Sequence, residues 1–265
     1  MKTIGFIGCG NMAQPIIRAV VKAALYDEVS VFDTDRAKLA AFCDSCGAKA
    51  VDAGTRIAAF CDVVMLCVKP QVLPDVLTQI RPVLREDALV VSIAAGKTTD
   101  WIAEKLGGRA VCRIMPNLNA TVGEAVSAYT GNAAASQAQI ETVGDICRAF
   151  GEAVRLPESL FSTFSVTGGC APAYTFMFIG ALADAAKANG LPDEAAFEVA
   201  VQCVLGSAKL LKVMGGDVSE WVRKVCSPGG TTIEGVRSLE ASDLGAIVRK
   251  AFDASLARDR ELSAG

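Results

Sequence analysis

Histidine is absent from this chain of 265 residues. Its imidazole is the side chain that ordinarily titrates near neutral pH, so the absence excludes histidine-based triads, histidine general acids and histidine-ligated metal sites. We therefore predict no metal centre. Positive charge is also sparse: 26 Lys and Arg stand against 29 Asp and Glu, the net charge is -3, and no basic stripe appears. These features argue against a nucleic acid partner.

We also expect neither a secretion signal nor a membrane span. Met1 and Lys2 lead directly into an apolar strand and a glycine turn, which is unlike a signal peptide. Residues 159–183 carry no charge, and their length alone would fit a membrane span. They include several hydroxyl side chains, the pair Gly168-Gly169 and a proline, so we interpret them as a buried helix interrupted by a glycine turn. We expect no membrane partner.

Ten cysteines are present, but their spacing is irregular and several, such as Cys61, Cys67 and Cys112, lie inside apolar strands. Free cysteine behaves as a small core residue, and disulfides are rare in reducing compartments. The pair Cys43 and Cys46 has neither a second pair nor a histidine to accompany it, so we interpret it as incidental. We expect reduced thiols and a cytoplasmic protein.

The clearest motif is a glycine turn at residues 8–13, which reads G-C-G-N-M-A and follows the apolar run 4–7. This is the G-x-G-x-x-A form of the dinucleotide-binding turn. Gly8 permits the tight turn, Gly10 lets the backbone approach a pyrophosphate, and Ala13 lets the following helix pack on the strand. Free N–H groups at the helix start attract phosphates. The pattern predicts a dinucleotide site.

Asp33 and Arg36, which follow the second predicted strand, bear on the choice between NAD and NADP. Asp33 stands where an acid would hold a ribose 2′-hydroxyl and favour NAD. Arg36 could instead pair with the 2′-phosphate of NADP. Both residue types are present, so this part of the sequence leaves the choice open.

Further strands alternate with helices up to residue 115. The apolar strand 62–68 ends at Lys69-Pro70, and a lysine at the carboxyl end of a central strand lies in the ligand crevice of a doubly wound sheet. The strand 89–93 is followed by Ala94-Ala95, whose small side chains let a flat ring lie close. We expect additional strands at 122–130 and 151–156. The fold class is therefore α/β, with a Rossmann-type N-terminal domain over residues 1–156.

Strand patterns stop at Pro157. Helices predicted at 171–189 and 192–214 are apolar nearly all round, which is typical of buried helices. A domain of about 110 residues cannot bury so much apolar helix surface by itself, so we expect a second copy of the chain to cover these helices. Residues 157–265 are thus predicted to form an all-α dimerisation and substrate domain, with helices interlocked between two copies.

A second glycine-led helix start lies in this half, in the stretch S-P-G-G-T-T at residues 227–232. Thr231 and Glu234 have the spacing of a capping box, so a helix is expected to begin near Thr231. Its backbone N–H groups and hydroxyls could hold a small anion. A helix cap with an ordinary turn explains the same residues, and the two interpretations remain open on the pattern alone.

Several motifs together resemble the pyrroline-5-carboxylate reductases over essentially the whole chain. They are G-F-I-G-C-G-N-M-A at 5–13, C-V-K-P at 67–70, S-I-A-A-G at 92–96, R-I-M-P-N at 113–117, V-T-G-G-C-A-P-A-Y at 166–174 and S-P-G-G-T-T at 227–232. The last two are the most specific. Gly169-Cys170 departs from the small serine/glycine pair that is common in the family, and we expect little consequence.

The resemblance implies reduction of 1-pyrroline-5-carboxylate to L-proline, the last step of proline biosynthesis, with NADPH or alternatively NADH. It also implies an interlocked homodimer that often assembles further into a decamer. The implied cofactor contacts are Ile7, Gly8, Gly10, Asn11, Met12, Asp33, Arg36, Val68, Lys69, Pro70, Ala94, Ala95 and Asn117. The implied substrate contacts are Ser227, Gly229, Gly230, Thr231 and Thr232 of the partner subunit, and the candidate catalytic residues are Thr232, Ser227 and Lys69.

The missing histidines agree with reduction of a C=N bond. A cyclic imine is basic enough to be partly protonated, whereas a ketone becomes an alkoxide and needs a placed acid. The β-hydroxyacid dehydrogenases, an alternative with the same glycine turn, place a lysine on the first interdomain helix. Residues 166–184 contain no lysine, and Lys187 comes too late. A non-catalytic NADP-sensing module, the other alternative, does not explain the loop at 227–232.

Overall fold

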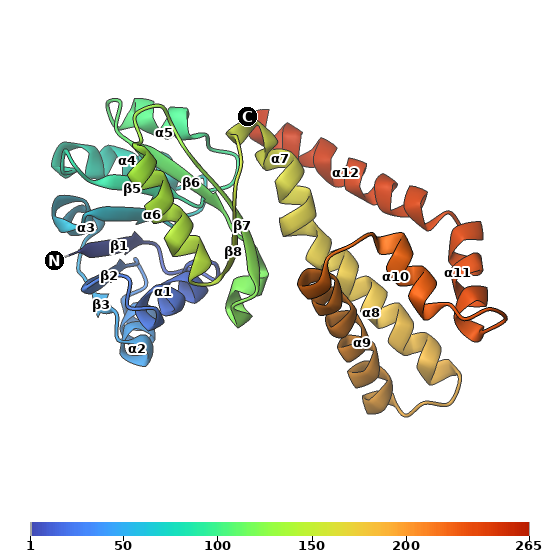
Figure 1. Cartoon of the computed structure of the whole chain (residues 1–265). Helices are drawn as coiled ribbons and strands as arrows, with labels where there is room; N and C mark the ends of the chain where they lie inside the picture. Colours follow the sequence, from blue (N-terminus) through green and yellow to red (C-terminus); the bar gives the residue numbers. More distant parts are fainter. Residues whose placement is uncertain (1, 265) are drawn as a thin grey trace. The chain divides into compact units, whose positions relative to one another are not determined.

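The computed structural model describes residues 2–264 (Figure 1). Met1 and Gly265, the outermost residues of the two predicted domains, lie outside the described residues. The chain forms two compact units. We call Met1–Gly169 together with Leu256–Gly265 the sheet unit, and Cys170–Ser255 the helical unit.

The sheet unit is built on eight strands in the order β3-β2-β1-β4-β5-β6-β7-β8. They are β1 (Thr3–Ile7), β2 (Glu28–Phe32), β3 (Lys49–Ala50), β4 (Val63–Leu66), β5 (Leu89–Ser92), β6 (Val111–Met115), β7 (Ala125–Gly131) and β8 (Gly151–Arg155). Strands β1 to β6 are parallel, whereas β7 runs antiparallel to β6 and β8 runs parallel to β7. The strand order reverses between β1 and β4, and this switch point is where doubly wound sheets bind ligands. The predicted Rossmann-type fold is confirmed.

Helices cover both faces of this sheet. They are α1 (Ala13–Lys22), α2 (Arg36–Cys46), α3 (Gly54–Phe60), α4 (Leu73–Ile80), α5 (Thr99–Lys105) and α6 (Gln137–Arg148). One apolar cluster includes Ile16 of α1, Leu39 of α2 and Ile140 of α6. The other includes Ile57 of α3 and side chains of α4 and α5. The central strands β4 and β5 are therefore buried on both sides, which explains the apolar sequence of β4 and the apolar run 89–91 of β5.

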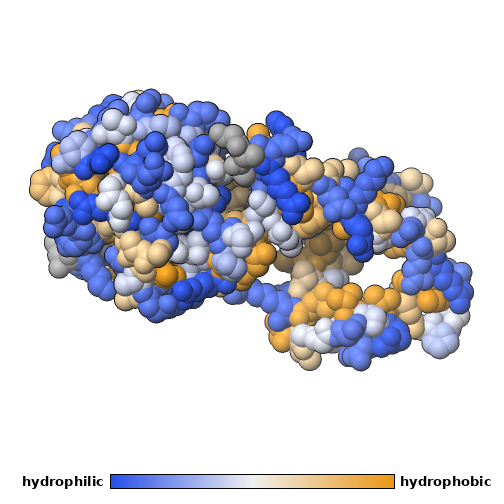
Figure 2. All heavy atoms as spheres, turned by 90° about the horizontal axis from the view of Figure 1, so that it is seen from above, coloured by the Kyte–Doolittle hydropathy of each residue, from blue (hydrophilic) through white to orange (hydrophobic). Residues whose placement is uncertain are grey.

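The helical unit contains α8 (Ala171–Ala188), α9 (Asp193–Met214), α10 (Val218–Val225), α11 (Thr231–Ala241) and most of α12 (Leu244–Ala264). Helices α8 and α9 pack against each other, and the Tyr174 hydroxyl lies 2.5 Å from Ser255 Oγ of α12. Apolar side chains nevertheless remain exposed along these helices, shown in orange in Figure 2. Phe176 is 58% exposed and Met177 is 75% exposed.

The charge-free segment differs from the interrupted, buried helix predicted above. A 3-10 turn (Glu158–Leu160), α7 (Phe161–Phe164) and a π-helical turn (Ser165–Cys170) run directly into α8. Glycine thus widens the helix locally without breaking it, because i→i+5 bonds still satisfy the backbone. By length and composition, Glu158–Ala188 could cross a membrane, and 17% of its apolar window is buried in this single chain. Within α8, Ala183 is buried.

Candidate active site

The glycine turn joins β1 to α1 at the switch point. Gly8 has φ +105, and a Cβ there would lie 2.7 Å from the Cys67 carbonyl oxygen. Conformation and close approach of the next strand therefore both require glycine at this position. A Cβ at Gly10 would meet nothing within 4 Å, so the backbone is open to a ligand. Helix α1 then begins with no side-chain cap, which leaves N–H groups available for phosphate.

Asp33 and Arg36 both lie at the carboxyl end of β2, beside this turn. The Asp33 carboxylate accepts hydrogen bonds from the backbone N–H of Cys9, at 2.7 Å, and of Asp35, at 3.0 Å. Arg36 donates to the carbonyls of residues 51 and 52 and stacks over the Phe32 ring, 5.1 Å from its centroid. Asp33 thus holds the glycine turn in shape, a role that the motif alone did not reveal.

The carboxyl ends of β4 and β5 adjoin that of β1. The backbone N–H of Cys67 donates to the Ile7 carbonyl at 2.8 Å, and that of Ile93 donates to the Leu66 carbonyl at 3.1 Å. Two predicted contact regions, residues 68–70 and residues 94–95, therefore leave the sheet from neighbouring strands. Of these residues Lys69 is exposed, while Ala94 is 3% exposed.

Asn117 follows β6 and is 5% exposed. Its Nδ2 donates to the Gly168 carbonyl at 2.8 Å, whereas its Oδ1 is buried without a partner among the described residues. An unpaired buried acceptor costs about 1–3 kcal/mol. A ligand amide, such as the carboxamide of a nicotinamide, would remove that cost, so the site fits this cofactor.

The loop at residues 227–232 lies in the helical unit. Helix α11 begins at Thr231 as expected, but its N-cap is Gly230 and no side chain caps it. The predicted capping box is wrong: Glu234 pairs with Arg237 at 2.7 Å instead of reaching back to the helix start. The first N–H groups of α11 are therefore free to bind an anion. A pocket of about 540 Å³ is lined by part of this loop and by Arg223, Glu234 and Arg237.

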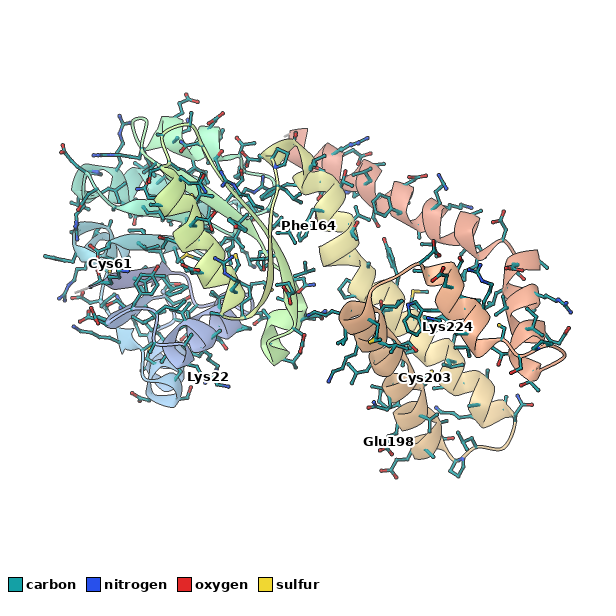
Figure 3. The ribbon with its side chains drawn as sticks, viewed as in Figure 1. Lys22, Cys61, Phe164, Glu198, Cys203 and Lys224 are labelled. Carbon is teal, nitrogen blue, oxygen red and sulfur yellow. The ribbon has the colours of Figure 1, made fainter. Side chains whose placement is uncertain are left out.

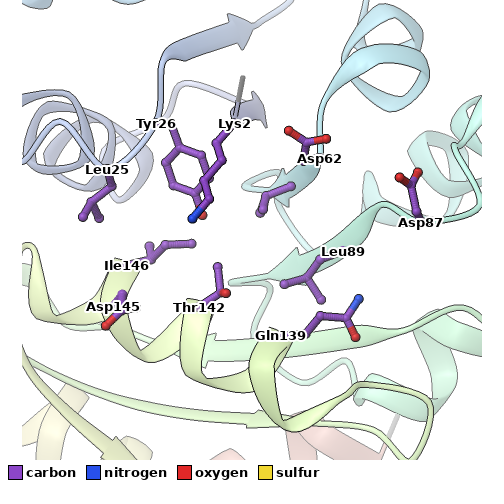
Figure 4. A pocket seen from close by; sticks show the side chains of 11 residues that line it. Lys2, Leu25, Tyr26, Asp62, Asp87, Leu89, Gln139, Thr142, Asp145 and Ile146 are labelled. Carbon is purple, nitrogen blue, oxygen red and sulfur yellow. The ribbon is translucent and has the colours of Figure 1, made fainter.

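Another hollow, of about 330 Å³, lies at the opposite edge of the sheet (Figure 4). Lys2, Asp62 and Asp87 stand just before β1, β4 and β5 in its lining. Burial, helped by the charges of Asp145 and Asp62, raises the pKa of Tyr26 to about 12. This hollow faces the amino ends of the strands, whereas dinucleotides bind at the carboxyl ends.

The cysteines of the described residues are free thiols. Those whose pKa is shifted have a raised pKa, whereas a catalytic thiol needs a lowered one. Burial is the main cause that raises the pKa of Cys9, within the glycine turn, to about 11. Cys61 behaves likewise inside the sheet unit, whereas Cys203 is exposed on α9 (Figure 3). A thiol with a raised pKa stays protonated at neutral pH and reacts slowly.

One pair of charged residues escaped the sequence interpretation. Arg113 of β6 and Glu158 form an ion pair of 2.9 Å, with side chains 9% and 23% exposed. The sequence did indicate that Arg113 has a charged partner, because it lies inside the apolar strand V-C-R-I-M and a buried charge must be paired. Nothing in the sequence identified which acid that partner would be.

A doubly wound sheet with a glycine turn open at Gly10, followed by a helical unit, is typical of the NAD(P)-dependent oxidoreductases. Residues 158–262 match the family model described as pyrroline-5-carboxylate reductase dimerisation, and residues 3–96 match NADP oxidoreductase coenzyme F420-dependent. The chain is 39% identical to pyrroline-5-carboxylate reductase of Escherichia coli (strain K12), over 99% of this chain and 98% of the relative. The chain belongs to the pyrroline-5-carboxylate reductase family.

Solved structures agree with this assignment. A pyrroline-5-carboxylate reductase from Coxiella burnetii matches with a TM-score of 0.93 and 32% identity, over 98% of this chain and 97% of that one. The Plasmodium falciparum pyrroline carboxylate reductase with NADP bound matches with a TM-score of 0.87 and 25% identity, over 99% and 98%. Both similarities span the two units of the chain.

Proposed function

We propose that this protein reduces 1-pyrroline-5-carboxylate to L-proline with NADPH, or alternatively NADH, as the last step of proline biosynthesis in the cytoplasm. The observation that carries the proposal is the 39% identity to a pyrroline-5-carboxylate reductase along 99% of the chain. An NADP-containing structure of the P. falciparum relative supports a nicotinamide cofactor. The same identity, which spans both units of the chain, argues against the β-hydroxyacid dehydrogenase and sensing-module alternatives.

The sheet unit supplies the residues that would hold the cofactor. We assign the pyrophosphate to the glycine turn, with Ile7, Gly8, Gly10, Asn11 and Met12, and the adenosine ribose to Asp33 and Arg36. We assign the nicotinamide half to Val68, Lys69, Pro70, Ala94, Ala95 and Asn117. Support comes from the open space at Gly10 and the unpaired buried Oδ1 of Asn117.

The loop at residues 227–232 is the proposed substrate anchor. The free N–H groups at the start of α11 would hold the substrate carboxylate, beside a pocket lined by Arg223 and by the Arg237–Glu234 ion pair. Reduction of the C=N bond adds a hydride to carbon, supplied by the cofactor, and a proton to nitrogen. We assign Thr232 to hydrogen-bond the ring nitrogen, with Ser227 and Lys69 as further candidates for holding or moving the proton. No histidine is needed, because the imine is itself basic.

The oligomer that we propose is a homodimer with interlocked helical units, in which each loop at 227–232 serves the partner's cofactor site. The exposed apolar faces of α8 and α9 and the match to a dimerisation model support it. Further assembly into decamers is part of the same proposal. By role, we assign residues 1–156 to cofactor binding and residues 157–265 to dimerisation and substrate binding. The compact units instead divide after Gly169, because the helical turns that precede α8 pack on the sheet unit.

Steady-state kinetics test this function directly. The purified protein should oxidise NADPH or NADH on addition of 1-pyrroline-5-carboxylate and release proline in equal amount. Comparison of kcat/KM for the two cofactors decides the preference that Asp33 and Arg36 leave open. The absence of turnover with both cofactors, in protein shown to be folded and oligomeric, would reject the proposal.

A further inference from the structure

The carboxylate of Glu158 joins three segments that are far apart in the sequence. It accepts hydrogen bonds from the backbone N–H of Thr99, at 3.1 and 3.2 Å, and from the Thr99 hydroxyl, at 2.7 Å. It also pairs with Arg113 of β6, whose guanidinium stacks over Phe161, 5.0 Å from the ring centroid. The 3-10 turn, the start of α5 and strand β6 are thereby tied together.

The segment that Glu158 anchors begins at Ala94, in the proposed nicotinamide region. Residues 93–98 connect β5 to α5, and the stretch 94–98 is held at its first end by the buried Ser92, whose hydroxyl accepts from the Ala94 N–H at 3.1 Å. Glu158 holds the other end at Thr99, the first residue of α5. Gly96, with φ +72, allows the turn between the two anchors. The position of Ala95 therefore depends on both hydrogen-bonded ends.

A pocket of about 180 Å³ brings these groups together. Ala95, Gly96, Arg113 and Glu158 all line it. A change in the Glu158 contacts would therefore reach the loop directly and would not have to pass through the rest of the core.

We propose that Glu158 is a positioning residue for the nicotinamide half of the cofactor, acting through the 94–98 loop. The inference rests on the proposed function, since it takes the ligand of that loop to be a nicotinamide. Glu158 itself touches neither substrate nor cofactor in this scheme. Its effect is specific to one half of the cofactor, because the glycine turn that takes the pyrophosphate is held separately by Asp33.

Binding of two ligands to Glu158→Gln tests the proposal. One ligand is the preferred dinucleotide, and the other is its fragment without nicotinamide, ADP-ribose or 2′-phospho-ADP-ribose. We expect the Kd of the dinucleotide to rise about tenfold, because the displaced loop no longer packs on the nicotinamide, and that of the fragment to stay within about twofold. Trp101 on α5 provides the fluorescence signal in a Trp221→Phe background, as the chain has two tryptophans.

Equal changes for both ligands, including no change for either, would overturn the proposal and leave Glu158 with a purely structural role. Glu104→Gln, the same substitution at an exposed position of α5, is the matched control and should leave both Kd values unchanged. Because Glu158→Gln leaves Arg113 buried without a full charge partner, the double variant Glu158→Met, Arg113→Met is measured as well. Removing both charges often preserves stability, so this variant should keep its Tm and still lose affinity for the dinucleotide alone.

These binding measurements need no turnover. They therefore remain interpretable even if 1-pyrroline-5-carboxylate proves not to be the substrate, and failure of the proposed function is distinguishable from failure of this inference. Where the reductase activity is present, the KM for 1-pyrroline-5-carboxylate should stay within about twofold while kcat/KM for the dinucleotide falls about tenfold, as expected for misplacement of one reacting group. An increase confined to the KM for 1-pyrroline-5-carboxylate would contradict the inference.

Discussion

The sheet unit and the helical unit treat their apolar side chains in opposite ways. Strands β4 and β5 are buried along their whole length between two helical layers. In α8, by contrast, Met177 is 75% exposed, and in α9 Phe197 is 59% exposed. Contiguous apolar surface of this kind marks an interaction site. The sheet unit can complete its core within one chain, whereas the helical unit needs a second copy to cover its helices.

The glycine turns that precede α1 and α11 also differ in how closely the rest of the chain packs around them. Gly8 is required by a backbone contact with Cys67 as well as by its φ of +105. Gly229 also has a positive φ, of +70, but a Cβ there would meet nothing within 4 Å. Gly8 is therefore fixed by packing inside its own unit as well as by its conformation, whereas Gly229 is required by its conformation alone.

We expect the largest loss of activity from a charge placed on the exposed apolar surface of α8. Met177→Glu would place an unpaired charge in the proposed dimer interface, at a cost of several kcal/mol. We expect sedimentation to show monomers of 27.5 kDa and kcat/KM to fall by at least about 100-fold, as each loop at 227–232 would lose its partner. The matched control is Phe60→Glu in the sheet unit, where Phe60 is 69% exposed. A fully active Met177→Glu dimer would contradict the interface assignment.

Gly8→Ala and Gly10→Ala separate packing from ligand binding within one turn. At Gly8 the new Cβ would clash with the Cys67 carbonyl and strain the backbone, so we expect a loss of roughly 2–4 kcal/mol in the free energy of unfolding. At Gly10 the space is open, so stability should be unchanged while dinucleotide affinity falls. Urea unfolding and ligand titration measure the two effects. Equal stability of both variants would refute the distinction.

Thr232→Ala and Thr231→Ala examine the second helix start. Loss of the Thr232 hydroxyl should lower kcat/KM about tenfold or more, since groups that assist proton transfer typically contribute ~100-fold or more. Thr231→Ala keeps the backbone N–H proposed to hold the carboxylate, so its effect should be within about twofold. If kcat/KM of Thr232→Ala falls less than about threefold, its hydroxyl has no part in the mechanism.

The smallest effect concerns the buried thiols of the sheet unit. Burial is the first cause of the rise in the pKa of Cys61 from 9.0 to about 11. Between these two values the unfolded chain loses a proton that the folded chain retains, so this thiol's contribution to stability is complete below pH 9.0 and is lost as the pH rises towards about 11. Cys61→Ala should flatten the fall in urea midpoint over this range.

Cys203→Ala, at an exposed position of α9, is the control and should leave the pH dependence unchanged. The other titrating groups of the chain are common to both variants, so the difference between the two curves isolates the buried thiol. Identical slopes for both variants would contradict the role of Cys61.

Much of the sheet unit was predictable because its signals are local. Alternation of apolar strands with helices indicated the doubly wound sheet, and the spacing of Gly8, Gly10 and Ala13 indicated the dinucleotide turn. Both depend on backbone conformation and on neighbours within a few residues. The helical unit was predicted as helices, but the π-helical turn at 165–170 was missed because its Gly168-Gly169 pair suggested a break.

The sequence by itself thus determined the fold class, the glycine turn and the family resemblance, since these depend on residue types at short fixed spacings. Only the tertiary structure decided the partners of isolated charges. Asp33 bonds to Cys9, 24 residues away, and Glu158 bonds to Arg113, 45 residues away. The order of strands in the sheet brings such groups together, and no local pattern encodes that order.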